Sequence, residues 1–259
     1  MLAKKTNNIN LEKKLSSEKK FHDLKYTQSQ AYPVHYQYNP TYKIFVKMKE
    51  KLGNIDGKRI LEYGCGTGWV TAELSSMGGY IDAFDISDQA INRTKKNLSR
   101  KKLDKNCTIQ KMSAERLKYP DESFDIIFGF AILHHLNLDM AMPELYRVMK
   151  PSSVAYFAEP LGENPIIKMY RKLTPQYRTA EERPIVMDEF LPYTKTFRKY
   201  THEEFYLTAL LPFALAYLPI SRKVFDAALT PFMKIDEVLF KYFPVLGKFA
   251  WYSIFELRK

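Results

Sequence analysis

The stretch Ile60–Val70, with the sequence ILEYGCGTGWV, decides the fold expected for this chain. Its apolar start predicts a buried strand, its three alternating glycines predict a turn, and the apolar positions from Val70 onward predict a helix. Glycine lets a backbone approach a ligand closely, and the N–H groups at the start of the following helix face the polar end of such a ligand. The stretch therefore predicts the first strand, turn and helix of a ligand-binding α/β sheet.

Strand-like and helix-like segments alternate in the residues that follow. We expect strands at residues 59–63, 80–84, 107–111, 124–130, 153–158 and 250–257. After the second of these, Ser87 is suited to cap a helix that buries Ile91, Thr94 and Leu98. The alternation predicts an α/β fold with a doubly wound, mostly parallel sheet.

Asp85 closes the second expected strand, 21 residues after Gly64. Ligands of open parallel sheets bind beyond the carboxyl ends of the strands, where a carboxylate suits the two hydroxyls of a ribose. A dinucleotide-dependent oxidoreductase shares these features, but its G-x-G-x-x-G motif would place Trp69 where close helix packing requires glycine. The pattern therefore disfavours a dinucleotide site.

The motif from Glu62 to Gly68, an acidic residue followed by x-G-x-G-x-G, resembles the first motif of the class I S-adenosylmethionine-dependent methyltransferases. Residues 120–136 (PDESFDIIFGFAILHHL) and 144–151 (ELYRVMKP) resemble the type 11 branch, which includes quinone C-methyltransferase-like enzymes. The resemblance spans about residues 59–159. It implies a seven-stranded Rossmann-like sheet, S-adenosylmethionine as the cofactor and an enzyme that transfers its methyl group.

The same resemblance assigns the cofactor-binding residues. By this resemblance, Asp85 corresponds to the acidic residue that binds the ribose hydroxyls of the cofactor. Glu62 lies near the methionine end of the cofactor, and the turn at Ser113 contacts its adenine. Ser113 departs from the commoner Asp, which costs roughly 1 kcal/mol of binding if one hydrogen bond is lost. The full set implied is Glu62, Gly64, Cys65, Gly66, Asp85, Ile86, Ser113, Ala114 and Phe130.

Catalytic candidates are fewer, because methyl transfer from a sulfonium needs no protein nucleophile. Cys65 is therefore expected to pack rather than react, and no metal ion is expected. His134 and His135 are adjacent, so we expect one to point inward and the other, His135, to face the acceptor as a general base. Glu159, after the fifth strand, is a further candidate for the mouth of the substrate site. An aromatic cluster before the core either covers the cofactor or belongs to the hydrophobic core; it comprises Tyr26, Tyr32, His35 and Tyr36.

The charge of the chain is concentrated in its flanks. The total of 40 Lys and Arg against 29 Asp and Glu gives a net charge of +11. Residues 59–159, the expected cofactor-binding core, are neutral, with 13 basic and 13 acidic residues. Residues 1–58, an expected helical flank of the same domain, carry +7, and residues 160–259 carry +4. We expect this last region to form a substrate cap, with a helix starting at Thr201–Glu204, as a helical insertion before the final strand.

The functional hypotheses depend on the composition of the two flanking regions. An apolar, mildly basic cap favours in-line methyl transfer to a small apolar or aromatic metabolite or lipid, with peripheral membrane contact through the cap. Two alternatives stay open: an RNA methyltransferase, which the basic charge suggests, and a non-catalytic membrane-surface protein that retains the fold. Nucleic acid is the less favoured partner, and the oligomeric state is open.

The location of the protein is inferred from its cysteines and its N-terminus. Only two cysteines and no apolar leader segment favour a cytoplasmic protein. The longest uncharged run, Phe205–Ser221, has 17 residues and two prolines, which is short for a transmembrane helix.

Overall fold

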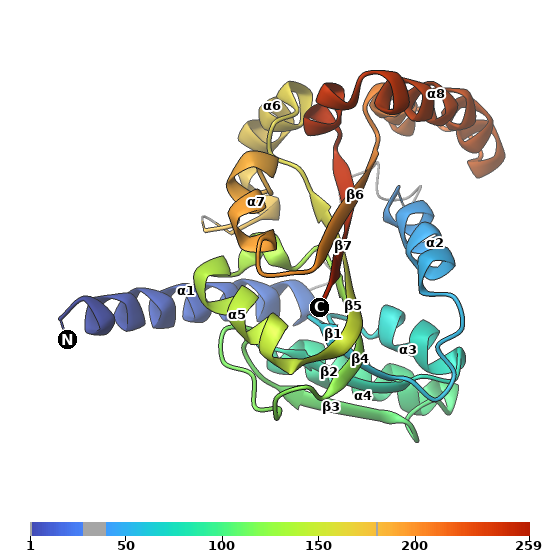
Figure 1. Ribbon diagram of the computed structural model, residues 1–259. Coiled ribbons are helices and arrows are strands. Elements are labelled where there is room, and N and C mark those ends of the chain that lie inside the picture. Colours follow the sequence, from blue (N-terminus) through green and yellow to red (C-terminus); the bar gives the residue numbers. More distant parts are fainter. Residues whose placement is uncertain (1, 28–39, 180) are drawn as a thin grey trace.

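A seven-stranded sheet forms the centre of the computed structural model, which describes residues 2–27, 40–179 and 181–259 (Figure 1). The strands lie in the order β3-β2-β1-β4-β5-β7-β6, and β7 runs antiparallel to both of its neighbours. The remaining pairs are parallel. Their bounds are β1 Arg59–Tyr63, β2 Tyr80–Asp85, β3 Cys107–Lys111, β4 Phe124–Phe130, β5 Met149–Pro160, β6 Lys199–Phe205 and β7 Tyr252–Arg258. This confirms the mostly parallel Rossmann-like sheet.

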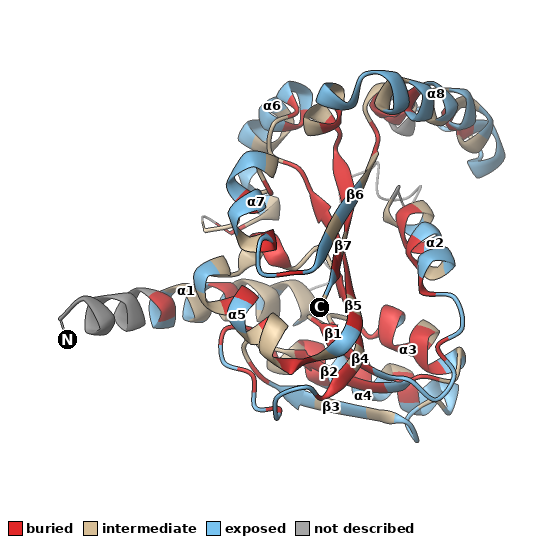
Figure 2. Ribbon diagram, viewed as in Figure 1, coloured by how far each residue is buried: buried red, intermediate tan, exposed pale blue. Residues whose placement is uncertain are grey.

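Helices cover both faces of this sheet, and each face has its own hydrophobic core (Figure 2). On one face α2, α3 and α8 pack with the side chains of Ile60 and Phe128. On the other, α5 and α7 pack against Leu61 and Ile127. The helix bounds are α1 Leu2–Thr27, α2 Pro40–Leu52, α3 Trp69–Ser76, α4 Asp88–Lys101, α5 Leu138–Val148, α6 Pro165–Leu173, α7 Met187–Thr194 and α8 Arg222–Tyr242. Short 3-10 helices are η2 Leu133–His135, η3 Pro175–Tyr177, η4 Thr208–Tyr217 and η5 Pro244–Phe249.

The local expectations near the glycine turn are confirmed. The Ser87 hydroxyl accepts a hydrogen bond from the backbone N–H of Ala90 and so caps α4, which buries Ile91, Thr94 and Leu98. Six expected strands occur within a few residues of their predicted bounds.

The expected helix at Thr201–Glu204 is wrong, because these residues lie in strand β6. The segment pairs with β7, where Thr201 faces Glu256 and Phe205 faces Tyr252. Its Ser/Thr-x-x-Glu pattern is a local signal, and the hydrogen bonds available along β7 outweigh it. The region before the final strand is therefore a helical insertion that also contributes a strand.

Candidate active site

The glycine turn and Asp85 are joined directly at the carboxyl ends of β1 and β2. Gly64, Gly66 and Gly68 all have positive φ, between 52° and 75°. One carboxylate oxygen of Asp85 accepts the backbone N–H of Gly66 at 3.1 Å, and the other accepts that of Ser87 at 2.9 Å. Burial raises the pKa of Asp85, while these two N–H groups offset part of the rise. The turn and the carboxylate thus form one rigid wall.

A cavity of about 350 Å³ opens beside this wall. Six of the residues predicted for the site line it, namely Gly64, Asp85, Ile86, Ala114, Phe130 and His135. Ile86, Met112 and Ala114 give it an apolar side next to the Asp85 carboxylate. An apolar slot beside a carboxylate matches a purine base linked to a ribose.

Four predicted residues lie behind the cavity wall instead: Glu62, Cys65, Gly66 and Ser113. Glu62 is 2% exposed, and burial raises its pKa to about 8. Burial likewise raises the pKa of Cys65, so its thiol stays protonated, as expected for a packing residue. The Ser113 hydroxyl donates to the carboxylate of Glu115, which itself lines the cavity.

The two adjacent histidines share one side of the cavity rather than pointing apart. Their rings, on the short helix η2, lie 4.2 Å apart between centroids, and both line the cavity. The expectation that one would point inward assumed regular helix or strand geometry, which this single 3-10 turn does not have. Burial and the neighbouring His134 lower the pKa of His135, so its imidazole is neutral at pH 7.

Glu159 holds η2 in place from β5. Its carboxylate is fully buried and accepts the backbone N–H groups of Ile132 and Leu133 at 2.9 and 2.8 Å. It also lies 2.7 Å from Nδ1 of His134. Glu159 was expected at the substrate mouth, but it lies beneath the histidines and orients them.

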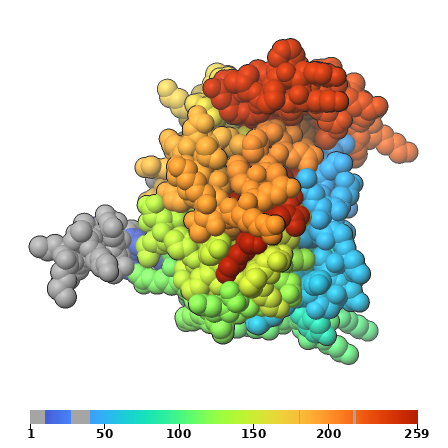
Figure 3. Space-filling view, viewed as in Figure 1, coloured from blue at the N-terminus to red at the C-terminus, as the bar shows by residue number. Residues whose placement is uncertain are grey.

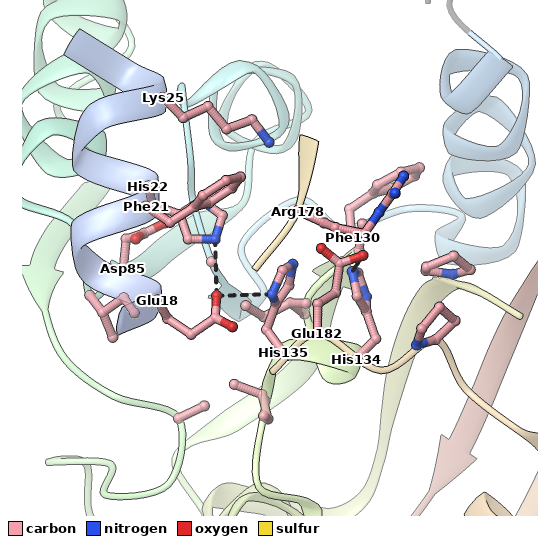
Figure 4. A pocket seen from close by; sticks show the side chains of 18 of the residues that line it. Glu18, Phe21, His22, Lys25, Asp85, Phe130, His134, His135, Arg178 and Glu182 are labelled. Atoms are coloured by element: carbon pink, nitrogen blue, oxygen red, sulfur yellow. Dashed lines mark ion pairs between the residues drawn. The ribbon is translucent and has the colours of Figure 1, made fainter. Parts of the chain in front are cut away.

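Helix α1 supplies a wall of the cavity that the sequence did not predict (Figure 4). Glu18, Phe21, His22, Lys25 and Tyr26 all line it. Their spacing of three and four residues places them on one face of α1, which was the available signal. This spacing was not recognised as a sign of a binding site because α1 is rich in lysine and lies far in sequence from the glycine turn. Of the aromatic cluster expected here, Tyr26 lines the cavity, and Tyr32, His35 and Tyr36 lie outside the described residues.

The far side of the cavity comes from the region after β5. Ile167 and Tyr170 of α6, Arg178 and Glu182 in the segment after it, and Trp251 at the start of the last strand line this side. Arg171 pairs with Glu182 at 2.6 Å. The cavity therefore has a wall suited to a nucleoside at one end and a mixed aromatic and charged wall at the other.

Comparison with known proteins agrees with this geometry. Residues 61–157 match the family described as methyltransferase domain. The chain is 31% identical over 144 residues to demethylmenaquinone methyltransferase of Lactobacillus johnsonii, covering 52% of this chain and 57% of that protein. Residues 61–157 therefore form a methyltransferase domain. The relatives that this part of the chain resembles are quinone C-methyltransferases.

Other proteins are similar over the same core. It is 32% identical over 121 residues to the ubiquinone/menaquinone biosynthesis C-methyltransferase UbiE of Vibrio parahaemolyticus, covering 44% of this chain and 46% of that protein. The chain thus spans about half the length of these relatives. A solved structure of Haemonchus contortus phosphoethanolamine N-methyltransferase 2 with S-adenosyl-L-methionine has a similar fold, with a TM-score of 0.60, 16% identity and coverage of 84% of this chain and 52% of that one.

S-adenosylmethionine, the cofactor of class I methyltransferases, fits the residues that line this cavity. Gly64 lines the cavity at a φ of +70°, and a Cβ there would meet Ile132 at 2.9 Å, so the backbone approaches the site without a side chain. Each Asp85 oxygen accepts one N–H, a carboxylate oxygen can accept a second hydrogen bond, and Asp85 lines the cavity, so it can bind a ribose hydroxyl. Glycine turn, carboxylate and apolar slot are therefore compatible with S-adenosylmethionine.

Proposed function

We propose that this methyltransferase transfers the methyl group of S-adenosylmethionine to a small apolar or aromatic acceptor. The observation that carries the proposal is one continuous cavity, with Asp85 and Ala114 at one end and His135 and Trp251 at the other. S-adenosylmethionine supplies an electrophilic methyl group when bound. The quinone-related names of the relatives support an acceptor of the aromatic class.

The chain's contribution is to position the two reactants and exclude water. Asp85 and Gly64 would fix the nucleoside, while the aromatic side chains of Phe130 and Trp251 would hold an apolar acceptor against the transferable methyl group. His135 lies at this acceptor end, where a neutral imidazole can take a proton from an acceptor hydroxyl or bind a metal ion.

Calorimetric titration with S-adenosylmethionine tests the cofactor half of the proposal. The parent protein should bind, and Asp85→Ala should weaken binding at least tenfold, whereas the exposed Asp139→Ala control should not. Labelled S-adenosylmethionine with a cell extract, followed by mass spectrometry of labelled products, tests the acceptor half. Absence of binding by the parent, or label only in RNA, would contradict the proposal.

We also propose that the cap contacts an anionic lipid bilayer. Helix α8 exposes a stripe of apolar side chains, Val224, Ile235, Val238 and Tyr242, each 47–66% exposed, on the side away from its buried Phe225. A helix with an apolar stripe on its outer face as well as its inner one requires a second apolar environment. This surface lies at the top of the molecule in Figures 1 and 3.

Helix α6 continues the same surface and leads to the cavity. Ile166, Met169 and Leu173 are 51–72% exposed on its outer side, while Ile167 and Tyr170 line the cavity from its inner side. An acceptor dissolved in the bilayer would therefore have a short path to the site. Among the described residues, no helix is long and apolar enough to cross a membrane, so the contact would be interfacial.

The charge on this surface favours an anionic bilayer over a second protein. Five exposed lysines flank the two apolar stripes, where long side chains can reach lipid headgroups; they are Lys168, Lys172, Lys223, Lys234 and Lys241. The exposed carboxylate within the same helices is Glu237.

Vesicle flotation tests this contact. The protein should float with vesicles rich in phosphatidylglycerol and float less with pure phosphatidylcholine. The double substitution Ile235→Asp and Val238→Asp should abolish flotation, while Tyr80→Asp, at an exposed position at the start of β2, should not. Equal flotation of both variants would contradict the proposal.

A further inference from the structure

A cluster of one carboxylate and two imidazoles lines the cavity. Ligand atoms of Glu18, His22 and His135 all lie within 4.8 Å of one another. Glu18 and His22 are one turn apart on α1, and His135 reaches them from η2 (Figure 4). Because α1 and η2 come from distant parts of the chain, only the folded protein assembles this set.

The distances from Glu18 to the two imidazoles are close to those between ligands that share one ion. Oε2 of Glu18 lies 3.1 Å from Nδ1 of His135 and 3.5 Å from Nε2 of His22. Ligands bound at about 2.0–2.1 Å to one tetrahedral or octahedral zinc-like ion are separated by about 3 Å. The observed separations require little adjustment to meet at a common point.

The orientation of the groups separates an ion site from an ordinary hydrogen bond. Oε2 of Glu18 and Nδ1 of His135 are both buried and form an ion pair at 3.1 Å, without the alignment of a hydrogen bond. The side chain of Glu18 is 3% exposed, and its other oxygen accepts the hydroxyl of Thr179 at 2.5 Å. Thr179 thus fixes the carboxylate while leaving Oε2 directed into the cluster. A poorly aligned buried pair offsets only part of the cost of burying its polar atoms, and a cation between the two atoms removes the remainder.

We propose that Glu18, His22 and His135 bind a divalent transition-metal ion of the zinc or iron(II) class. Two imidazoles and one carboxylate suit such ions and leave coordination positions open. All three side chains line the cavity, so an acceptor oxygen that enters it can fill an open position.

A metal ion at this place restricts the chemical class of the methyl acceptor. This statement about the acceptor rests on the proposed function. A metal ion lowers the pKa of an oxygen bound to it and so favours a phenolate or enolate at neutral pH. The acceptor would be a phenol or an enol whose oxygen binds the ion, and whose proton is lost to solvent on binding. His135 then acts as a metal ligand rather than as the general base that the sequence suggested.

Metal binding by the full-length, untagged protein tests the site without methyl transfer. Chelator-treated protein is titrated with Co²⁺, followed by visible absorption, and with Zn²⁺, followed by calorimetry. We expect one ion per chain, with visible Co²⁺ bands. Glu18→Gln and His22→Gln should each weaken binding at least tenfold, and His202→Gln, an exposed histidine of β6, should bind like the parent.

Two further variants distinguish this metal site from the overlapping cluster and from the cofactor site. Glu182→Gln tests the overlapping set of His134, His135 and Glu182 and should leave binding unchanged. Asp85→Ala should lose S-adenosylmethionine but still bind Co²⁺, so that failure of the proposed function and failure of the metal site are distinguishable. Absence of Co²⁺ bands in the parent, unchanged affinity in Glu18→Gln, or loss in Glu182→Gln alone would overturn the inference. Circular dichroism of every variant checks that it is folded.

Discussion

The carboxylate of Glu159 lies 2.7 Å from Nδ1 of His134 while also accepting the backbone N–H groups of Ile132 and Leu133. One fully buried side chain on β5 therefore fixes both the backbone of η2 and the orientation of one imidazole. The adjacent His135 depends on the same turn for its position. The side of the cavity that His134 and His135 line is thus held by a residue that does not line it.

Substitution of Glu159 should affect folding and the site together. Glu159→Gln keeps the size of the side chain but removes the charge that pairs with the N–H groups and His134, so we expect unfolding free energy to fall by roughly 2–4 kcal/mol. Urea unfolding measures this loss, and the exposed Glu50→Gln should change stability by less than about 0.5 kcal/mol. Equal stability of Glu159→Gln and the parent would show that the carboxylate does not hold η2.

Glu62 should make the stability of the cofactor-free protein fall as the pH rises. Its pKa is about 8 in the folded protein and near its ordinary value of 4.5 when unfolded, so between these values the unfolded state has lost a proton that the folded state retains. Unfolding free energy should decrease across this window by up to about 1.4 kcal/mol per pH unit from this group. Urea unfolding at pH 5, 6, 7 and 8 should show a shallower decrease for Glu62→Gln than for the parent. Parallel profiles would place the pKa of Glu62 near its ordinary value.

Position 68 requires glycine for two reasons, its left-handed backbone conformation and its close neighbours. A comparison with Gly53 measures the two effects separately. Both have positive φ, 75° and 62°, but a Cβ on Gly68 would lie 2.8 Å from Cα of Thr94, whereas one on Gly53 meets nothing within 4 Å. Gly53→Ala should therefore cost about 1–2 kcal/mol of stability, the price of the left-handed conformation alone. Gly68→Ala should cost clearly more, because it also displaces α3 from α4. Similar thermal unfolding of the two variants would contradict the packing argument.

Asp236 anchors the cap and offers a test of its local stability. This buried residue of α8 accepts the N–H groups of Leu207, Thr208 and Ala209 at 2.7–3.1 Å and so caps the start of η4. Asp236→Ala should leave three N–H groups without an acceptor and increase hydrogen exchange throughout η4 and α8. Glu237→Gln, on the exposed side of α8, is the matched control and should exchange like the parent. Unchanged exchange in Asp236→Ala would show that other contacts hold the cap.

The sequence alone determined the parts of the molecule whose physics is local. Positive φ at Gly64, Gly66 and Gly68, the cap at Ser87 and the carboxylate of Asp85 all follow from short-range conformational and hydrogen-bonding preferences, which a residue pattern records directly. The alternation of apolar segments likewise predicted the sheet, because each segment must bury one face.

Tertiary structure alone decided which distant groups meet. Strand β6 exists because β7 offers it a pairing edge, against the local helix-capping pattern of Thr201–Glu204. Glu18 contacts His135 across more than a hundred residues of sequence, and Glu159 of β5 contacts His134 of η2. Such contacts depend on how whole elements pack, and no residue type or spacing encodes them. The glycine-turn end of the cavity was therefore readable in the sequence, and the end that holds the two histidines became visible only in the folded chain.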